Sequence, residues 1–206
     1  MKIIAHRAND GIHKENSLEA ILNSLNQDYI DGVEVDIRLT KDGKFVLSHD
    51  PIYHGHFIKF TKEKKLQRLG INTLIEVLNE IKTDKIIMLE IKSEDSKYNK
   101  IINNLNKTLK PFHLNYYICS FNYNLIKKLK EKYSEYKCGL IIGYQINKDK
   151  INNNLNFNSL SLSYASNNFN KETFIWTVND LKNLNIKKRY NIITDNPLKI
   201  FKQMPK

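Results

Sequence analysis

Residues 32–38 read GVEVDIR, a short run in which apolar and charged side chains alternate. Successive side chains of a β-strand point to opposite faces, so Glu34 and Asp36 lie on the same face. Burying two carboxylates without a partner costs several kcal/mol unless a cation lies beside them. The stretch therefore predicts a strand whose charged face lines a site rather than a packed core.

Strand-like and helix-like segments alternate on both sides of this stretch. Short apolar or alternating runs predict strands over Ile3–His6, Gly32–Ile37, Lys44–Ser48, Ile86–Ile91, Tyr116–Ser120, Gly139–Ile142, Ser159–Ser163, Phe174–Val178 and Asn191–Thr194. Helical patterns lie between them, over Ser17–Gln27, Thr73–Ile81, Tyr98–Leu109, Asn122–Lys132, Asp180–Ile186 and Pro197–Phe201. We predict N-terminal helix caps at Ser17, Asn122 and Asp180.

Repeated alternation of strand and helix is typical of a parallel sheet. About eight such units favour an α/β fold of the closed (β/α)8 TIM-barrel type over an open doubly wound sheet. The usual barrel has about 250 residues, so one built from 206 residues must be compact. The Asn- and Ser-rich segment Lys148–Asn170 is either a loop or a degenerate helix of the barrel. We expect a single domain over residues 1–206.

The charge balance raises the question of an acidic partner. Lys and Arg number 33 against 22 Asp and Glu, which gives a net charge of +11. Nucleic acid, an anionic membrane surface and a phosphorylated substrate are the candidates. Almost all of the excess is lysine, whereas proteins that read DNA sequence rely on arginine. We therefore expect no nucleic-acid partner, and we interpret most of the charge as a lysine-rich surface.

Other classes of protein are disfavoured by what the sequence lacks. No window approaches the roughly 18 apolar residues of a membrane span, and the apolar run after Met1 is too short for a signal peptide. Cys119 and Cys138 lie in apolar contexts and are predicted to be reduced core residues. These features predict a cytoplasmic protein. Neither a Walker loop nor a dinucleotide-binding fingerprint is present.

Ionisable residues gather where the predicted strands end: His6 and Arg7, then His49 and Asp50, then Glu90 and Lys92. The C-terminal ends of barrel strands face one mouth, where active sites are built. Glu34, Asp36 and Glu90 would converge there without a thiolate. Such an oxygen-rich set indicates one hard divalent cation, Mg²⁺ or Ca²⁺. Carboxylates, histidines, an arginine and a lysine around one mouth suggest phosphoester chemistry.

Short motifs follow one another in a fixed order along the chain. They are His6-Arg7-Ala8, Lys14-Glu15-Asn16-Ser17, Glu34-Val35-Asp36, Thr40-Lys41-Asp42-Gly43, His49-Asp50, Thr73-Leu74 with Glu76, Glu90-Ile91-Lys92, Ser120-Phe121, Trp176-Thr177-Val178-Asn179 and Thr194-Asp195-Asn196-Pro197. In this order and spacing they resemble the glycerophosphodiester phosphodiesterase family, which belongs to a superfamily of TIM-barrel phosphodiesterases. The resemblance runs from Ile4 to about Pro197.

The resemblance implies a role for each matching residue. The metal ligands would be Glu34, Asp36 and Glu90, and the general acid and base would be His6 and His49. Arg7 and Lys92 would bind the phosphate, and Glu15 and Asn16 would orient Arg7 or a metal ligand. Trp176 would offer a flat face to the glycerol moiety, although a place in the core is an equal alternative.

Two departures from the family pattern concern the loops. Ala8 stands where the family has glycine, and Lys14 stands where it has proline, with His13 beside it. The segment Pro51–Asn72 is shorter than the family's usual insertion after the second barrel strand, and its His54 and His56 do not follow the family pattern. A shorter insertion would leave the mouth more open or alter substrate choice.

The expected reaction is metal-dependent hydrolysis of a small glycerophosphodiester to glycerol 3-phosphate and an alcohol. One alternative is a lysophospholipase D or sphingomyelinase D-like enzyme acting on lipids, for which Phe57, Ile58 and Phe60 are the visible hint. An alternative from another class is a non-catalytic basic protein that binds anionic membrane or nucleic acid. Peripheral contact with an anionic membrane also fits the charge. The alcohol, the choice of metal, which histidine is the base, a cyclic phosphate intermediate and the oligomeric state stay open.

Overall fold

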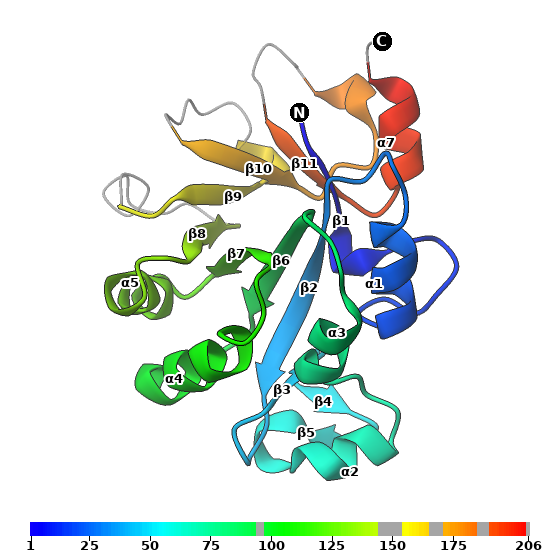
Figure 1. Ribbon diagram of the computed structural model, residues 1–206. Coiled ribbons are helices and arrows are strands. Elements are labelled where there is room, and N and C mark those ends of the chain that lie inside the picture. The colour runs from blue at the N-terminus through cyan, green and yellow to red at the C-terminus, as the bar shows by residue number, and fades with distance from the viewer. Residues whose placement is uncertain (94–96, 144–153, 165–170, 185–189, 205–206) are drawn as a thin grey trace.

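The computed structural model describes residues 1–93, 97–143, 154–164, 171–184 and 190–204. Its main feature is a closed barrel of parallel strands, which confirms the predicted TIM barrel (Figure 1). In order around the barrel the strands are β1 (Ile3–Ala5), β2 (Gly32–Leu39), β6 (Ile86–Ile91), β7 (Asn115–Ser120), β8 (Lys137–Ile142), β9 (Phe157–Ser161), β10 (Glu172–Trp176) and β11 (Asn191–Thr194). Because β1 pairs with both β2 and β11, the eight-stranded barrel closes without a free edge.

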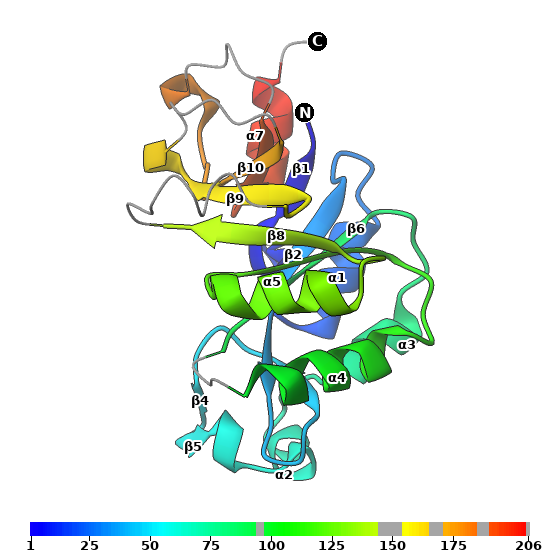
Figure 2. The same ribbon diagram turned by 90° about the vertical axis from the view of Figure 1, so that its left-hand side faces the viewer.

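Helices cover the outside of the barrel (Figures 1 and 2). They are α1 (Leu18–Leu25), α3 (Leu74–Glu80), α4 (Tyr98–Leu109), α5 (Tyr123–Lys132) and α7 (Pro197–Gln203). Two of the predicted caps are confirmed, because the side chain of Ser17 accepts a hydrogen bond from the amide of Ala20 and that of Asn122 from the amide of Leu125. These bonds satisfy amide groups that a helix start leaves without a partner.

The prediction of a helix over Asp180–Ile186 was wrong. In the described part of this range, which ends at Leu184, the chain makes only the 3-10 turn η4 (Leu181–Asn183), and Leu184 is extended, with φ −98° and ψ 122°. Asp180 does cap this turn, through the amide of Lys182. The segment Lys148–Asn170 lies partly outside the described residues. Its described part contains β9 and the 3-10 turn η3 (Leu162–Tyr164).

An insertion between β2 and β6 stands at the C-terminal mouth of the barrel. It contains β3 (Phe45–Leu47), the hairpin β4 (Ile52–Tyr53) and β5 (His56–Phe57), the turn η2 (Ile58–Phe60) and the helix α2 (Glu63–Arg68). The predicted strand at Lys44–Ser48 is β3, and it pairs antiparallel with β2 outside the barrel. The connection between β2 and β3 is too short for the crossover that parallel strands need.

An apolar layer fills the inside of the barrel. In this layer Phe157 and Phe174 lie 5.5 Å apart, and Tyr117 packs against both rings. Gly139 faces this layer, because a β-carbon there would lie 2.2 Å from the Phe157 ring.

Both cysteines are free and buried, as predicted. No helix within the described ranges is long and apolar enough to cross a membrane.

Candidate active site

A cavity of about 200 Å³ opens at the C-terminal mouth of the barrel, above the apolar layer. Six of the predicted site residues form its charged side: His6, Arg7, Glu34, His49, Glu90 and Lys92. Trp176 lies on the opposite side. The structure therefore brings together residues that are separated by as much as 170 positions in the sequence.

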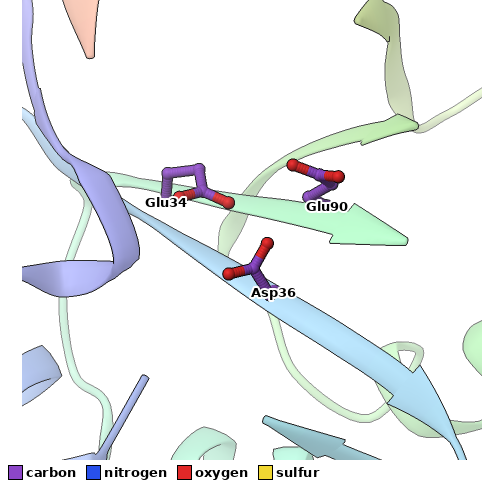
Figure 3. A group of neighbouring side chains, drawn as sticks. All are labelled: Glu34, Asp36 and Glu90. Carbon is purple, nitrogen blue, oxygen red and sulfur yellow. The ribbon is translucent and has the colours of Figure 1, made fainter. Parts of the chain in front are cut away.

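Glu34, Asp36 and Glu90 form a buried carboxylate cluster (Figure 3). Asp36 on β2 is the direct neighbour of Glu90 on β6, and Glu34 lies two residues before Asp36 on the same face of its strand. One oxygen from each residue lies within 4.8 Å of the other two. The three residues are 4%, 1% and 8% exposed. Glu34 and Asp36 thus share a face, as the alternation in residues 32–38 predicted, and Glu90 joins them from the strand predicted over Ile86–Ile91.

Mutual repulsion and burial make this cluster electrostatically costly. Burial, together with the charges of Asp36 and Glu90, raises the pKa of Glu34 well above its usual value. Burial also raises the pKa of Glu90, although Lys92 opposes the shift. Nζ of Lys92 lies 2.5 Å from Oε1 of Glu90 and 3.1 Å from Oδ1 of Asp36. Burial alone would lower the pKa of Lys92, but these two carboxylates raise it, so the lysine stays charged.

Arg7 approaches the same cluster from the end of β1. Its backbone amide donates to Oε2 of Glu34 at 2.9 Å, and its Nε lies 3.6 Å from Oδ2 of Asp36. Nη1 donates to Oε2 of Glu15 at 3.2 Å. Asn16 bonds Asp36 twice: its Nδ2 donates to Oδ2, and its Oδ1 accepts from the Asp36 amide, both at 2.9 Å. Glu15 and Asn16 are thus in contact with the residues that they were predicted to orient.

The loop that carries Arg7 has an unusual backbone. Arg7 and Ala8 both adopt left-handed conformations, with φ of 51° and 54°. At position 8 glycine would adopt this conformation without steric cost, whereas the β-carbon of alanine makes it unfavourable. The Ala8 methyl group is fully buried in the main core, and its carbonyl accepts from the Ser24 hydroxyl at 3.1 Å. The chain thus accepts a methyl group where the family has glycine by packing it against the core.

His6 is held by a residue to which the sequence reasoning gave no role. Its Nδ1 lies 2.6 Å from Oδ1 of Asp195, which follows β11. The amide group of Asn179 donates to Oδ2 of Asp195 at 2.8 Å, and its oxygen accepts from the Asp195 amide at 2.9 Å. Burial would raise the pKa of Asp195, but the bonds from Asn179 and His6 outweigh it and lower that pKa below its usual value. Asp195 is therefore a carboxylate fixed behind the His6 ring.

His49 has a comparable arrangement at the rim. Its Nδ1 lies 2.9 Å from Oδ1 of Asp50, and this bond lowers the pKa of Asp50. The backbone carbonyl of His49 accepts from both Nε and Nη2 of Arg38, at 3.0 and 2.6 Å. Arg38 is the second residue whose contribution was missed, although it ends the stretch that predicted the cluster.

The opposite side of the cavity is apolar. Trp176 packs edge-on against Phe121, with ring centroids 5.8 Å apart, and Met88, Ile141 and Ile193 complete this side.

The remaining histidines to which the sequence drew attention lie outside the cavity lining. Nδ1 of His13 bonds Asp10 in the first loop, and His54 and His56 belong to the insertion hairpin.

Comparisons with known proteins agree with this geometry. The family model of the "Glycerophosphoryl diester phosphodiesterase family" matches residues 6–59. A glycerophosphodiester phosphodiesterase of Caldanaerobacter subterraneus subsp. tengcongensis is 32% identical over 160 residues, which are 68% of this chain and 65% of that protein. The match thus spans slightly less than two thirds of the relative's length. The resemblance predicted from the motifs is confirmed.

Solved structures confirm the fold over almost the whole chain. A glycerophosphodiester phosphodiesterase from Parabacteroides distasonis has a TM-score of 0.86 and 20% identity, covering 98% of this chain and 96% of its own. A phosphodiesterase of Oleispira antarctica, solved with the product sn-glycerol-3-phosphate, has a TM-score of 0.83 and 22% identity, with coverage of 97% and 95%.

Proposed function

We propose that this protein is a single-domain enzyme that hydrolyses glycerophosphodiesters to glycerol 3-phosphate and an alcohol. The observation that carries the proposal is the buried cluster of Glu34, Asp36 and Glu90, flanked within one cavity by two histidines and two cationic side chains. The family resemblance supports the same reaction. A protein that only binds anions has no use for three buried carboxylates, which would repel its ligand.

The carboxylate cluster fits a divalent cation. Oε1 of Glu34 is buried and accepts no hydrogen bond from any part of the chain that the structure describes. The cluster carries three carboxylates against the two cations Arg7 and Lys92, so a further positive charge would relieve both the repulsion and the unsatisfied oxygen. An all-oxygen set suits Mg²⁺ or Ca²⁺. When bound, such an ion supplies a Lewis acid that stabilises negative charge on a phosphate oxygen.

Arg7 and Lys92 hold the phosphate in this proposal. The guanidinium of Arg7 is fixed by Glu15 and has planar donors that suit phosphate oxygens. The ammonium of Lys92 adds a second charge at the base of the same cavity. Both cations contact Asp36, so the carboxylate cluster also sets the position of the phosphate.

His6 and His49 transfer the protons. Since Nδ1 of each ring lies against a carboxylate, of Asp195 or Asp50, Nδ1 carries the hydrogen and Nε2 is the nitrogen left for the reaction. One histidine takes a proton from the attacking oxygen, and the other gives a proton to the departing alcohol. Asp195, clamped by Asn179, is a positioning residue for His6.

A lipid substrate is the second candidate. The exposed rings of Phe57 and Phe60 stand near the mouth, and the apolar side of the cavity includes Phe121. These features favour a lysophospholipase D or sphingomyelinase D-like reaction, in which the same charged residues would act on a phosphodiester that bears an acyl chain.

The experiment measures glycerol 3-phosphate release from glycerophosphocholine and glycerophosphoethanolamine, and lysophosphatidic acid release from lysophosphatidylcholine, in the presence of Mg²⁺ or Ca²⁺. We expect His6→Ala and His49→Ala each to lower turnover by about 10²- to 10⁴-fold. His113→Ala, which alters an exposed histidine far from the cavity lining, should leave turnover unchanged. Near-wild-type turnover by folded His6→Ala and His49→Ala proteins, or no release from any substrate, would overturn the proposal.

A further inference from the structure

The insertion at the barrel mouth has more apolar side chains than its own folding needs. Val46, Ile58, Leu66 and Ile71 form a separate buried cluster beneath it. Three further large apolar residues point outward instead: Ile52 is 44% exposed, Phe57 49% and Phe60 67%. Leaving such side chains in water forgoes stabilisation, so their exposure calls for an external partner.

The three exposed residues form one continuous patch, which we name the apolar tip. Ile52 and Phe57 are directly opposite each other in the hairpin of β4 and β5, and opposite residues lie on the same face. The rings of Phe57 and Phe60 are 6.2 Å apart. Nζ of Lys59 lies 5.1 Å from the centre of the Phe60 ring, so a cation stands beside the patch.

The charge around the apolar tip has one dominant sign. Residues 51–72 contain five lysines and arginines against a single acid, Glu63. Lys62, Lys64 and Lys65 are exposed. Aromatic rings combined with lysines on one short element are typical of segments that lie on an anionic lipid surface.

The position of the tip relative to the barrel agrees with such a surface. The hairpin and α2 lie beyond the C-terminal end of β2, whose arrow points toward them (Figure 1). Among the described residues, exposed large apolar side chains also follow the C-terminal ends of β1, β7 and β9, at Ile12, Phe121 and Leu162. Together with Ile52, Phe57 and Phe60 of the tip, these are six of the ten large apolar residues that are exposed in the described parts of the chain; the other four are Met1, Ile75, Leu198 and Phe201.

We propose that the apolar tip docks the mouth of the barrel onto an anionic membrane surface, with Phe57 and Phe60 inserted between head groups and the insertion's lysines held near them. A protein partner is a poorer match, since stable protein interfaces bury about 800 Å² on each side, whereas two or three side chains suffice to enter a lipid interface. Docking requires no catalysis, so a measurement of membrane binding tests it separately from the proposed hydrolysis.

The test is sedimentation with vesicles, which requires neither substrate nor metal. Wild-type protein should bind vesicles of phosphatidylcholine with about one third phosphatidylglycerol, and bind pure phosphatidylcholine more weakly. Raising the NaCl concentration from about 0.1 M to about 0.5 M should weaken binding. The double variant Phe57→Ser, Phe60→Ser should bind the anionic vesicles about ten-fold more weakly.

Phe201→Ser is the matched control, because Phe201 is 50% exposed but lies on α7, at the opposite end of the molecule from the insertion (Figures 1 and 2). It should bind as the wild type does. If the double variant does not fold by circular dichroism, Phe60→Ser alone should still weaken binding. No binding to anionic vesicles would overturn the proposal. So would equal binding by wild-type and folded Phe variants, which would assign any attraction to the lysine-rich surface as a whole.

Discussion

The two sides of the barrel cavity are built from different strands and differ in chemistry. The charged side comes from the neighbouring strands β1, β2 and β6 and the segments that follow them, which supply Arg7, Asp36 and Lys92 among others. The apolar side comes mainly from β7 to β10 and the residues that follow them, with Phe121 and Trp176 at its rim, and Met88 of β6 and Ile193 of β11 complete it. Under the proposed function, the phosphate contacts the charged side and the uncharged parts of a substrate contact the apolar side. The two sides meet where Nζ of Lys92 lies 5.8 Å from the centre of the Phe121 ring.

The connections between strands differ in a similar way, with β7 as an exception. The charged strands are followed by the helices α1, α3 and α4, and β7 is followed by α5, whereas η3 and η4 are the helical turns in the described parts of the connections after β9 and β10. The family model likewise covers residues 6–59, on the charged side. Tight packing behind the charged residues suits groups whose geometry determines reactivity.

The most damaging change to the charged side should be Asp36→Asn. Asp36 contacts Lys92, Arg7 and Asn16, so its loss removes a proposed metal ligand and releases the two cations that are proposed to bind the phosphate. We expect kcat/KM for a glycerophosphodiester to fall by about 10³-fold or more. Asp28→Asn, at an exposed position, is the control for the same chemical change. Activity within a few fold of wild type would mean that the carboxylate cluster is structural.

A smaller loss is expected for Asp195→Asn, which leaves the metal and phosphate groups untouched. The asparagine cannot supply a carboxylate charge to Nδ1 of His6, so the ring loses its fixed orientation. We expect kcat to fall by about 10²-fold with little change in KM. Steady-state kinetics measures kcat and KM, and a thermal unfolding curve shows whether the variant is as stable as the wild type. A raised KM with an unchanged kcat would show that Asp195 does not position the histidine.

The smallest effect should come from the apolar side. Trp176→Leu removes a flat ring that packs on Phe121 but takes no part in proton transfer. We expect KM to rise about three- to ten-fold and kcat to change little, as for the loss of about 1 kcal/mol of uniform binding. The measurement is a full substrate titration of wild-type and variant proteins. A large fall in kcat would show that Trp176 acts in the chemical step, as the residues of the charged side do. The functional distinction between the charged and apolar sides of the cavity would then be wrong.

The sequence predicted best those features that depend on short-range spacing. The two-residue spacing of Glu34 and Asp36 places both carboxylates on one face of a strand, and the same pattern recurs at Glu90 and Lys92. Parallel strands then bring these faces to a common mouth without any need for finer detail. The cluster was therefore predictable from the alternation in these two strands together with the predicted barrel.

Contacts between distant residues escaped prediction. Asp195 reaches His6 across 189 residues, because β11 closes the barrel beside β1 and places Thr194 opposite Ala5. A carboxylate that follows the last strand gives no local sequence signal that it will bond the imidazole of His6. The failed helix after Asp180 also involves a distant residue: Leu181 donates its amide to Oε1 of Gln203 on α7, and the chain is extended by Leu184. Tertiary contacts of this kind outweigh helix propensity.

The most direct test of the central claim is the metal dependence of glycerol 3-phosphate release by wild-type and Glu34→Gln proteins. The protein is treated with EDTA, its residual metal content is measured, and Mg²⁺ or Ca²⁺ is then added back. We predict that release by the wild type stops when the metal is removed and returns when it is restored, and that Glu34→Gln recovers little activity in the same range of metal concentration. Full activity of wild-type protein shown to be free of metal would contradict the account.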